Sequence, residues 1–124
     1  MIRKIGFVGI RTSRLDEVAA VFRDCLGASQ EDASEASVSF VAADGTAVEI
    51  YGTDDDFHRF FDTGPVIGFE VEDFDACRAA LVEKGIEFLT EIQQNERNAW
   101  QHFRLPDGTV AEIIGPRKGN SQQD

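Results

Sequence analysis

The chain has 124 residues, and 23 acidic against 12 basic residues give it a formal net charge of −11. With 42% hydrophobic residues and only three prolines, the composition is typical of one folded globular domain and excludes a disordered chain. The acidic balance and the lack of a Lys/Arg cluster argue against a nucleic-acid partner, because phosphate backbones attract concentrated positive charge. The composition is compatible with cationic or neutral small molecules as ligands.

Several features predict a cytoplasmic protein without a membrane partner. No apolar run approaches the roughly 20 residues that a transmembrane helix needs. Met1 leads directly into a strand pattern, without the apolar region of a signal peptide. Cys25 and Cys77 have no metal-type spacing, and each falls in a helical pattern, where we expect small buried thiols.

The first half of the chain predicts one helix among strands. In chain order we expect a strand at 4–12, a helix at 15–26, a short edge strand at 29–32, and strands at 36–43 and 46–52. The inward positions of the helix follow the 3.6-residue period: Leu15, Val18, Ala19, Phe22, Cys25 and Leu26. Gly27 ends the helix, and Asp44-Gly45 forms the turn between the last two strands.

The second half predicts the same order of elements. We expect a strand at 66–72, a helix at 74–84, and strands at 86–92, 98–105 and 109–115. The helix faces inward with Phe74, Cys77, Leu81 and Val82, and Gly85 ends it. Residues 116–124 form a polar, mobile tail.

A connector at 53–64 joins the two halves. Thr53 or Asp54 is expected to cap a short helix there, which carries Phe57, Phe60 and Phe61 on one side. These rings have three possible roles: packing within the monomer, closing one rim of a cavity, or forming a dimer contact.

An internal repeat relates the halves. Residues 44–52 and 107–115 share six of nine positions at an offset of 63, and each segment starts with Asp-Gly-Thr. The strand patterns also divide into two faces, because alternate side chains of a strand point to opposite sides. One face is apolar and suited to the helices, whereas the other mixes aromatic, charged and glycine residues. The mixture favours a ligand cavity over a plain solvated face.

The order of these parts, together with Val8-Gly9-Ile10, Phe69-Glu70-Val71 and the run from Phe103 to Gly108 that leads to Glu112, resembles the vicinal oxygen chelate superfamily. This superfamily includes glyoxalase I, extradiol dioxygenases, methylmalonyl-CoA epimerase and bleomycin-resistance proteins. The resemblance implies an α+β fold with two tandem βαβββ modules, a cup-shaped mixed sheet and helices on its outer face. We expect a single domain at 1–115, with modules at 4–52 and 66–115. The resemblance also raises the expectation of a homodimer.

Metal-using members of the superfamily hold the ion with His or Gln and Glu side chains. The corresponding positions here are Phe7, Glu49, Val66 and Glu112, so both carboxylates are kept and both imidazole positions are lost. A phenyl ring and an isopropyl group supply no metal ligand. We therefore expect no cofactor, and the alternative is one divalent metal ion held by Glu49, Glu112 and His102.

The candidate ligand cup is lined by residues of the mixed face: Phe7, Arg11, Glu49, Tyr51, Val66, Glu70, Trp100, His102, Arg104 and Glu112. Glu49 and Glu112 have three alternative roles: internal salt bridges with Arg11 and Arg104, contacts to a cationic or hydrogen-bond-donating ligand, or general-base catalysis. Trp100 either fills core space or offers a stacking surface.

The sequence does not decide whether the protein is an enzyme. The candidate catalytic residues are Glu49, Glu112 and His102. His102 is either an acid, base or metal ligand, or a hydrogen-bonded residue without a chemical role. His58 has no assigned function. The leading hypothesis is a metal-independent small-molecule binding protein similar to the bleomycin-resistance branch. The alternative is a metal-dependent lyase, isomerase or dioxygenase of the glyoxalase type with an altered metal shell.

Overall fold

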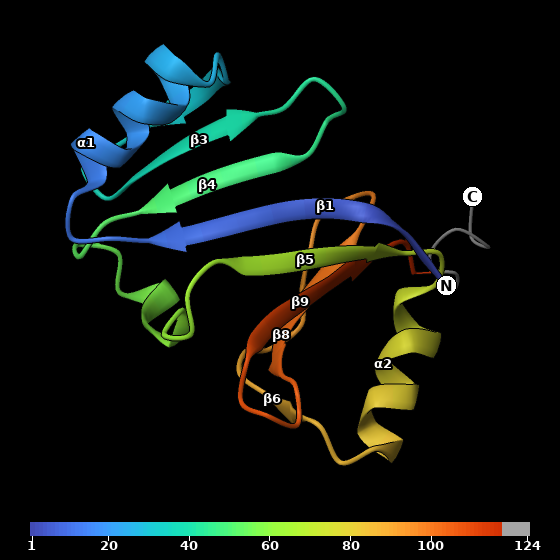
Figure 1. Ribbon diagram of the computed structural model, residues 1–124. Coiled ribbons are helices and arrows are strands. Elements are labelled where there is room, and N and C mark those ends of the chain that lie inside the picture. Colours follow the sequence, from blue (N-terminus) through green and yellow to red (C-terminus); the bar gives the residue numbers. More distant parts are fainter. Residues whose placement is uncertain (118–124) are drawn as a thin grey trace. The chain divides into compact units, whose positions relative to one another are not determined.

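A computed structural model describes residues 1–117, which form two compact units. The N-terminal unit is Phe7–Val66, and the C-terminal unit combines Met1–Gly6 with the chain from Ile67 onward. Strand β1 therefore contributes to both units, and in the C-terminal unit the Glu72 amide donates to the Met1 carbonyl at 3.2 Å. Figure 1 shows the elements of both units.

The N-terminal unit contains the first module, in the order β1, α1, β2, β3, β4. Its elements are β1 (Ile2–Arg11), α1 (Leu15–Ala20), the π-helix η1 (Val21–Cys25), β2 (Ser29–Ala33), β3 (Ser37–Val41), β4 (Ala47–Tyr51) and the 3₁₀ helix η2 (Phe57–Phe60). The strand order is β2-β3-β4-β1, with β1 and β4 parallel and the other pairs antiparallel.

The C-terminal unit repeats this order. Its elements are β5 (Val66–Val71), α2 (Phe74–Glu83), β6 (Glu87–Phe88), β7 (Gln93–Gln94), β8 (Ala99–Arg104) and β9 (Val110–Gly115). The strand order is β5-β9-β8-β6, and β7 pairs with β8. Strands β5 and β9 are parallel, as β1 and β4 are in the first module. The α+β class with two βαβββ modules is thus confirmed, while the strand expected at 86–92 is wrong, because two short strands, β6 and β7, take its place.

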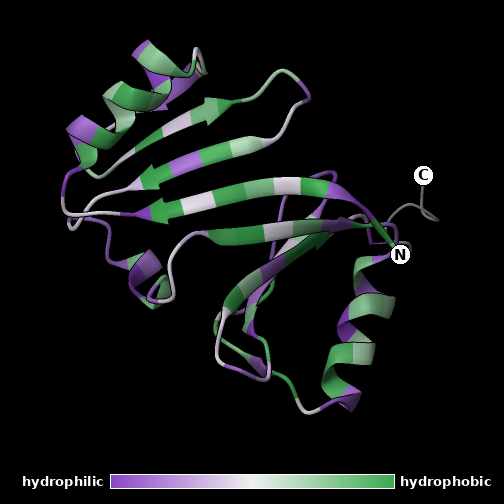
Figure 2. Ribbon diagram, in the orientation of Figure 1, coloured by the Kyte–Doolittle hydropathy of each residue, from purple (hydrophilic) through white to green (hydrophobic). Residues whose placement is uncertain are grey.

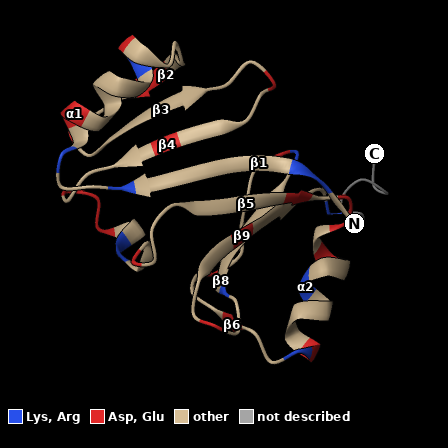
Figure 3. Cartoon of the chain, in the orientation of Figure 1, with Lys and Arg blue, Asp and Glu red and all other residues tan. Residues whose placement is uncertain are grey.

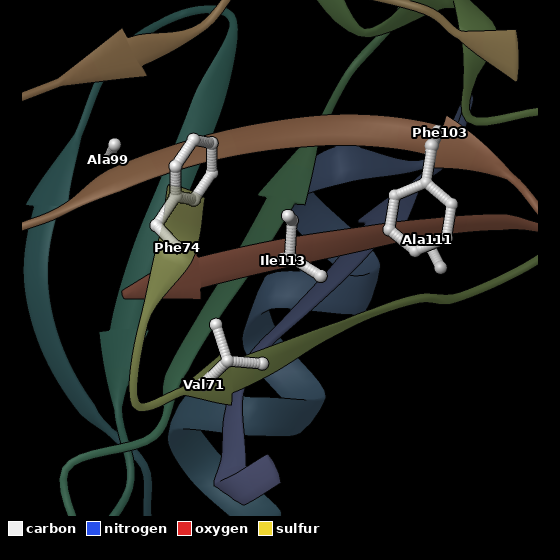
Figure 4. Close-up of a cluster of buried hydrophobic side chains, with 6 residues drawn as sticks. All are labelled: Val71, Phe74, Ala99, Phe103, Ala111 and Ile113. Atoms are coloured by element: carbon white, nitrogen blue, oxygen red, sulfur yellow. The ribbon is translucent and has the colours of Figure 1, made fainter. Parts of the chain in front are cut away.

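The apolar face of each sheet packs against its own helix. In the C-terminal unit Figure 4 shows the buried cluster of Val71, Phe74, Ala99, Phe103, Ala111 and Ile113, against which Cys77 and Leu81 of α2 also pack. In the N-terminal unit Ala19 lies in a cluster with Val38, Phe40 and Ile50. Figure 2 shows how pale and green segments follow one another along β3, as expected for a strand with one buried face.

The first helix does not keep the predicted α-helical period to its end. From Val21 it becomes a π-turn, in which the Leu26 amide donates to the Val21 carbonyl at 3.0 Å. The wider turn changes the direction of the following side chains. Cys25 is exposed and Leu26 is 65% exposed, so the prediction that they face inward is wrong.

The ends of the second module also differ from expectation. Val82 is 52% exposed, so its predicted inward position is wrong. The predicted tail begins with ordered contacts: the Phe74 amide donates to the Pro116 carbonyl at 3.0 Å, and Arg117 Nη2 lies 2.8 Å from Asp75 Oδ1. The rest of that predicted tail, 118–124, lies outside the described residues.

Turn residues behave as their chemistry predicts. Gly27 and Gly85 follow the two helices with φ of +67° and +76°, which only glycine adopts readily. The repeated Asp-Gly-Thr segments form matching turns, since the Thr46 amide donates to Asp44 Oδ1 and the Thr109 amide to Asp107 Oδ1, both at 3.0 Å.

Candidate functional site

The two repeat-related glutamates occupy equivalent places in their sheets. Glu49 is paired in register with Gly9 of β1 and Ser39 of β3. Glu112 is paired with Gly68 of β5 and His102 of β8. Each carboxylate therefore has a glycine on the parallel side and a polar residue on the antiparallel side. In Figure 3 Glu49 supplies the one red segment of the otherwise uncharged β4.

The side chains next to the two carboxylates differ. Tyr51 donates its hydroxyl to Glu49 Oε1 at 2.9 Å. Glu112 Oε2 lies 3.0 Å from His102 Nε2, and these two side chains are only 6% and 3% exposed. The repeat thus places equivalent carboxylates in different chemical settings, a phenol contact in one unit and an imidazole pair in the other.

The loop after β6 holds the backbone of His102 in place. Its amide donates to Thr90 Oγ1 at 3.2 Å, and its carbonyl accepts from the Leu89 amide at 2.9 Å. Gln101 precedes His102 and lies on the opposite face. Its Nε2 donates to the Thr90 carbonyl at 2.7 Å, and its Oε1 accepts from Arg78 Nε of α2 at 2.8 Å. Anchoring Gln101 toward the helix directs His102 to the mixed face.

Both arginines of the mixed face donate to backbone carbonyls. Arg11 Nη2 donates to the carbonyls of Thr53 and Asp55, at 3.4 and 3.0 Å. Arg104 Nη1 donates to the Gly108 carbonyl at 2.9 Å. Within residues 1–117 the Glu112 carboxylate lies next to the His102 imidazole, and the Arg11 guanidinium donates to backbone carbonyls. Within its own unit Arg11 therefore does not take the salt-bridge alternative with Glu49, and Glu112 lies next to His102 in place of Arg104.

The connector packs onto the mixed face of the N-terminal unit. Phe61 is 6% exposed and meets Phe7 and Tyr51 edge-on, with ring centroids 6.5 and 5.6 Å apart. It lies directly over Gly9, where an added Cβ would be 2.5 Å from Phe61 Cε2. Of the three alternatives for the connector rings, Phe61 thus takes packing within the monomer, whereas Phe57 is 49% exposed.

His58 is the main residue that sequence reasoning missed. It stacks on Tyr51 with a centroid distance of 3.7 Å and an interplanar angle of 15°, and its Nδ1 lies 3.0 Å from Asp55 Oδ1. Asp55 also accepts from the His58 amide at 2.8 Å. The N-cap residue of η2 is Asp56, without a side-chain cap hydrogen bond, so the predicted cap at Thr53 or Asp54 is wrong. The three-residue spacing between Asp55 and His58 is the sequence signal that could have predicted their contact.

The remaining candidate residues lie on the same faces. Trp100 is half-buried and donates its indole N–H to Gln93 Oε1 at 3.2 Å. Glu70 is half-buried beside Gly6 in the C-terminal unit. Val66 is fully buried and Phe7 is 8% exposed. Ser39, opposite Glu49, was detectable from the alternation of β3, which the list of candidates did not use.

Sequence comparison decides the family. Residues 4–113 match the profile of the Glyoxalase/Bleomycin resistance protein/Dioxygenase superfamily. The chain belongs to this superfamily. The resemblance found in the sequence is thereby confirmed. Comparison with functionally curated proteins finds no match.

Solved structures with the same fold cover nearly the whole chain. A glyoxalase/bleomycin resistance protein/dioxygenase superfamily member from Vibrio splendidus 12B01 has a TM-score of 0.66 and 15% identity, and the alignment covers 90% of this chain and 97% of that one. Methylmalonyl-CoA epimerase from Mycobacterium tuberculosis has a TM-score of 0.65 and 17% identity, with coverage of 98% and 93%.

A third similar structure carries a metal. The Mn(II)-bound glyoxalase from Novosphingobium aromaticivorans has a TM-score of 0.70 and 19% identity over 94% of this chain and 41% of that one. At these identities the likeness shows the fold alone.

The residues of this chain do not fit a metal ion of the superfamily type. Two of the four positions that the resemblance assigns to metal ligands are Phe7 and Val66, whose side chains have no donor atom. Within residues 1–117 no three His, Cys, Asp or Glu side chains are grouped so that they could hold an ion. His102 and Glu112 form a pair, and a divalent transition metal is ordinarily held by three or four protein ligands.

Proposed function

We propose that this protein is a metal-independent small-molecule binding protein of the glyoxalase/bleomycin-resistance superfamily. The observation that carries the proposal is the replacement of both imidazole positions by buried apolar side chains, Phe7 at 8% and Val66 at 0% exposure. Phe7 is packed against Phe61, so its ring is part of a packed aromatic surface. Side chains of this kind supply no donor atom to a metal.

The polar groups of the mixed faces favour a ligand with a cationic or hydrogen-bond-donating group. Glu49 is the single charged residue of β4, and Tyr51 fixes one of its oxygens. The net charge of −11 raises the local concentration of cations around the chain. The proposed ligand contacts are those predicted from the sequence, with Phe61 and Ser39 added.

A second candidate function is an enzyme, and the pair of His102 with Glu112 favours it. A buried carboxylate 3.0 Å from Nε2 restricts the orientation of the imidazole, which suits a residue that transfers protons. In this alternative His102 is the acid or base, Glu112 orients it, and Glu49 contacts the substrate. The metal-dependent form of the alternative requires a shell built from these same three residues.

Calorimetric titration of chelator-treated protein with Mn²⁺, Ni²⁺, Zn²⁺ and Fe²⁺ tests the metal independence. The proposal expects no saturable binding. Binding with one-to-one stoichiometry that is lost in Glu112→Gln or Glu49→Gln would overturn it and favour the metalloenzyme.

Fluorescence of Trp100, the one tryptophan, tests ligand binding in metal-free buffer. A panel of cationic and aromatic amines is expected to contain compounds that change the emission, and the change should weaken in Glu49→Gln. No response to any compound of the panel would count against the binding function.

The proposal extends to the oligomeric state and the cellular location of the protein. We expect a homodimer, which light scattering during gel filtration measures directly, and a cytoplasmic location. In residues 1–117 no helix is long and apolar enough to cross a membrane.

A further inference from the structure

Four side chains of the N-terminal unit form one connected path from the connector to Glu49. Asp55 Oδ1 and Oδ2 lie 3.0 and 3.1 Å from His58 Nδ1. The imidazole stacks on Tyr51 at 3.7 Å, and the Tyr51 hydroxyl donates to Glu49 Oε1 at 2.9 Å. Each step of the path is a direct contact.

The path is largely shielded from water. The side chains of Asp55 and His58 are 15% and 17% exposed, and Tyr51 is 5% exposed. Hydrogen bonds are stronger and more directional where water is excluded. Arg11 Nη2 donates to the Asp55 carbonyl at 3.0 Å and ties the backbone of this loop to β1.

We propose that His58 is the positioning residue of Glu49. Asp55 fixes the imidazole, the imidazole covers one face of the Tyr51 ring, and the ring so held directs its hydroxyl to Glu49. This inference rests on the proposed function, in which Glu49 contacts the ligand.

The arrangement also selects the class of ligand cation. One face of Tyr51 is occupied by His58, which reduces the aromatic surface that a quaternary ammonium needs for cation–π contact. A carboxylate accepts hydrogen bonds through both oxygens, and charge-assisted N–H donors form the strongest of them. The site therefore favours protonated primary or secondary amines and amidines over quaternary ammonium compounds.

The alternative is that His58 merely stabilises the connector. Arg59 offers a matched control, because it lies in the same helical turn and pairs with Asp56 at 2.8 Å with the same three-residue spacing. This control pair is 72% and 77% exposed. Its loss alters the connector without altering the path to Glu49.

Tyr51 is the one tyrosine of the chain, so its Raman doublet reports the hydrogen bond of its hydroxyl without ambiguity. The full-length protein is expected to show the intensity ratio of a strong donor. His58→Ala should move the ratio toward that of a hydroxyl in water, Asp55→Asn should move it less, and Arg59→Ala should leave it unchanged. An unchanged ratio in folded His58→Ala would overturn the proposal.

Should His58→Ala fail to fold, His58→Phe keeps the stacking and loses the bond to Asp55. A shifted ratio in that variant supports the step in which Asp55 fixes the ring that holds Tyr51, and an unshifted ratio contradicts that step. Circular dichroism shows which variants are folded.

A pair of probes tests the ligand class. Benzylammonium is expected to bind at least about tenfold more tightly than benzyltrimethylammonium, because only the former donates N–H bonds to Glu49. The preference should shrink in His58→Ala and persist in Arg59→Ala. Equal affinity for both probes would overturn the ligand class. If neither probe binds, the proposed site fails, whereas the Raman result still decides whether His58 positions Tyr51.

Discussion

Gly9→Ala tests the packing of Phe61 on the mixed face. A methyl group at this position would stand 2.5 Å from Phe61 Cε2 and 2.7 Å from Phe7 Cζ, whereas carbon atoms in contact are normally about 3.5–4.0 Å apart. The two rings must therefore move by about 1 Å. Overpacking of this kind costs about 1–3 kcal/mol.

An opposing effect reduces the expected loss. Replacing glycine by alanine restricts the unfolded chain and stabilises by about 0.4–1 kcal/mol where the native backbone allows it. The net loss for Gly9→Ala is then about 1–2 kcal/mol. With a urea dependence of about 2 kcal/mol per molar, the middle of the usual range, the unfolding midpoint should fall by about 0.5–1 M. Urea denaturation followed by circular dichroism measures this shift.

Gly6→Ala is the matched control in the same strand. Its added methyl group would meet Glu70 Cβ and Oε2 at 3.5 and 3.6 Å, which is ordinary contact. The midpoint should therefore stay unchanged or rise. Phe61→Leu removes the clashing ring edge, so the double variant Gly9→Ala/Phe61→Leu should lose less than the sum of the two single losses. An unchanged midpoint in Gly9→Ala, or strict additivity with Phe61→Leu, would refute this account of the aromatic packing.

Three further changes test other parts of the structure. Burial raises the pKa of the Cys77 thiol, which lowers its thiolate fraction at a given pH. Iodoacetamide should therefore modify exposed Cys25 first, as measured by mass spectrometry, and the difference should disappear in denaturant. Equal rates of modification in the native protein would contradict the burial of Cys77. Asp73→Ala removes the side-chain cap of α2 and should cost about 1 kcal/mol in urea denaturation, whereas Asp73→Asn should retain most of it; equal losses would refute the cap. Glu112→Ala leaves His102 buried without its carboxylate and should cost about 3 kcal/mol by thermal or urea unfolding, and a loss below 1 kcal/mol would show that the pair contributes little.

Sequence patterns predicted the elements well because their signals are local. The 3.6-residue period of Leu15, Val18 and Ala19 and the glycines after both helices depend on neighbouring residues alone. The Asp-Gly-Thr turns form in both modules because an Asp side chain caps a nearby amide and Gly adopts positive φ. The same repeat also correctly placed Glu49 and Glu112 in equivalent strands.

Partners of charged side chains were decided by tertiary structure. Arg11 and Glu112 lie on faces where the sequence allowed an arginine–carboxylate pair, yet a long guanidinium side chain reaches many acceptors, and Arg11 binds loop carbonyls. His102 takes Glu112 because the antiparallel register of β8 and β9 sets them directly opposite each other. Register is a relation between strands, and alternation within one strand does not specify it.

By itself the sequence determined the order of the elements and the two-module repeat, since these follow from residue types and their spacing. The loss of both imidazole positions is what the resemblance to the superfamily implies. Tertiary structure decided three other features: the π-turn that exposes Cys25 and Leu26, the packing of Phe61 over Gly9, and the path from Asp55 through His58. The physical reason is that local patterns state which side chains prefer burial, whereas the space left between packed elements determines which of them obtain it.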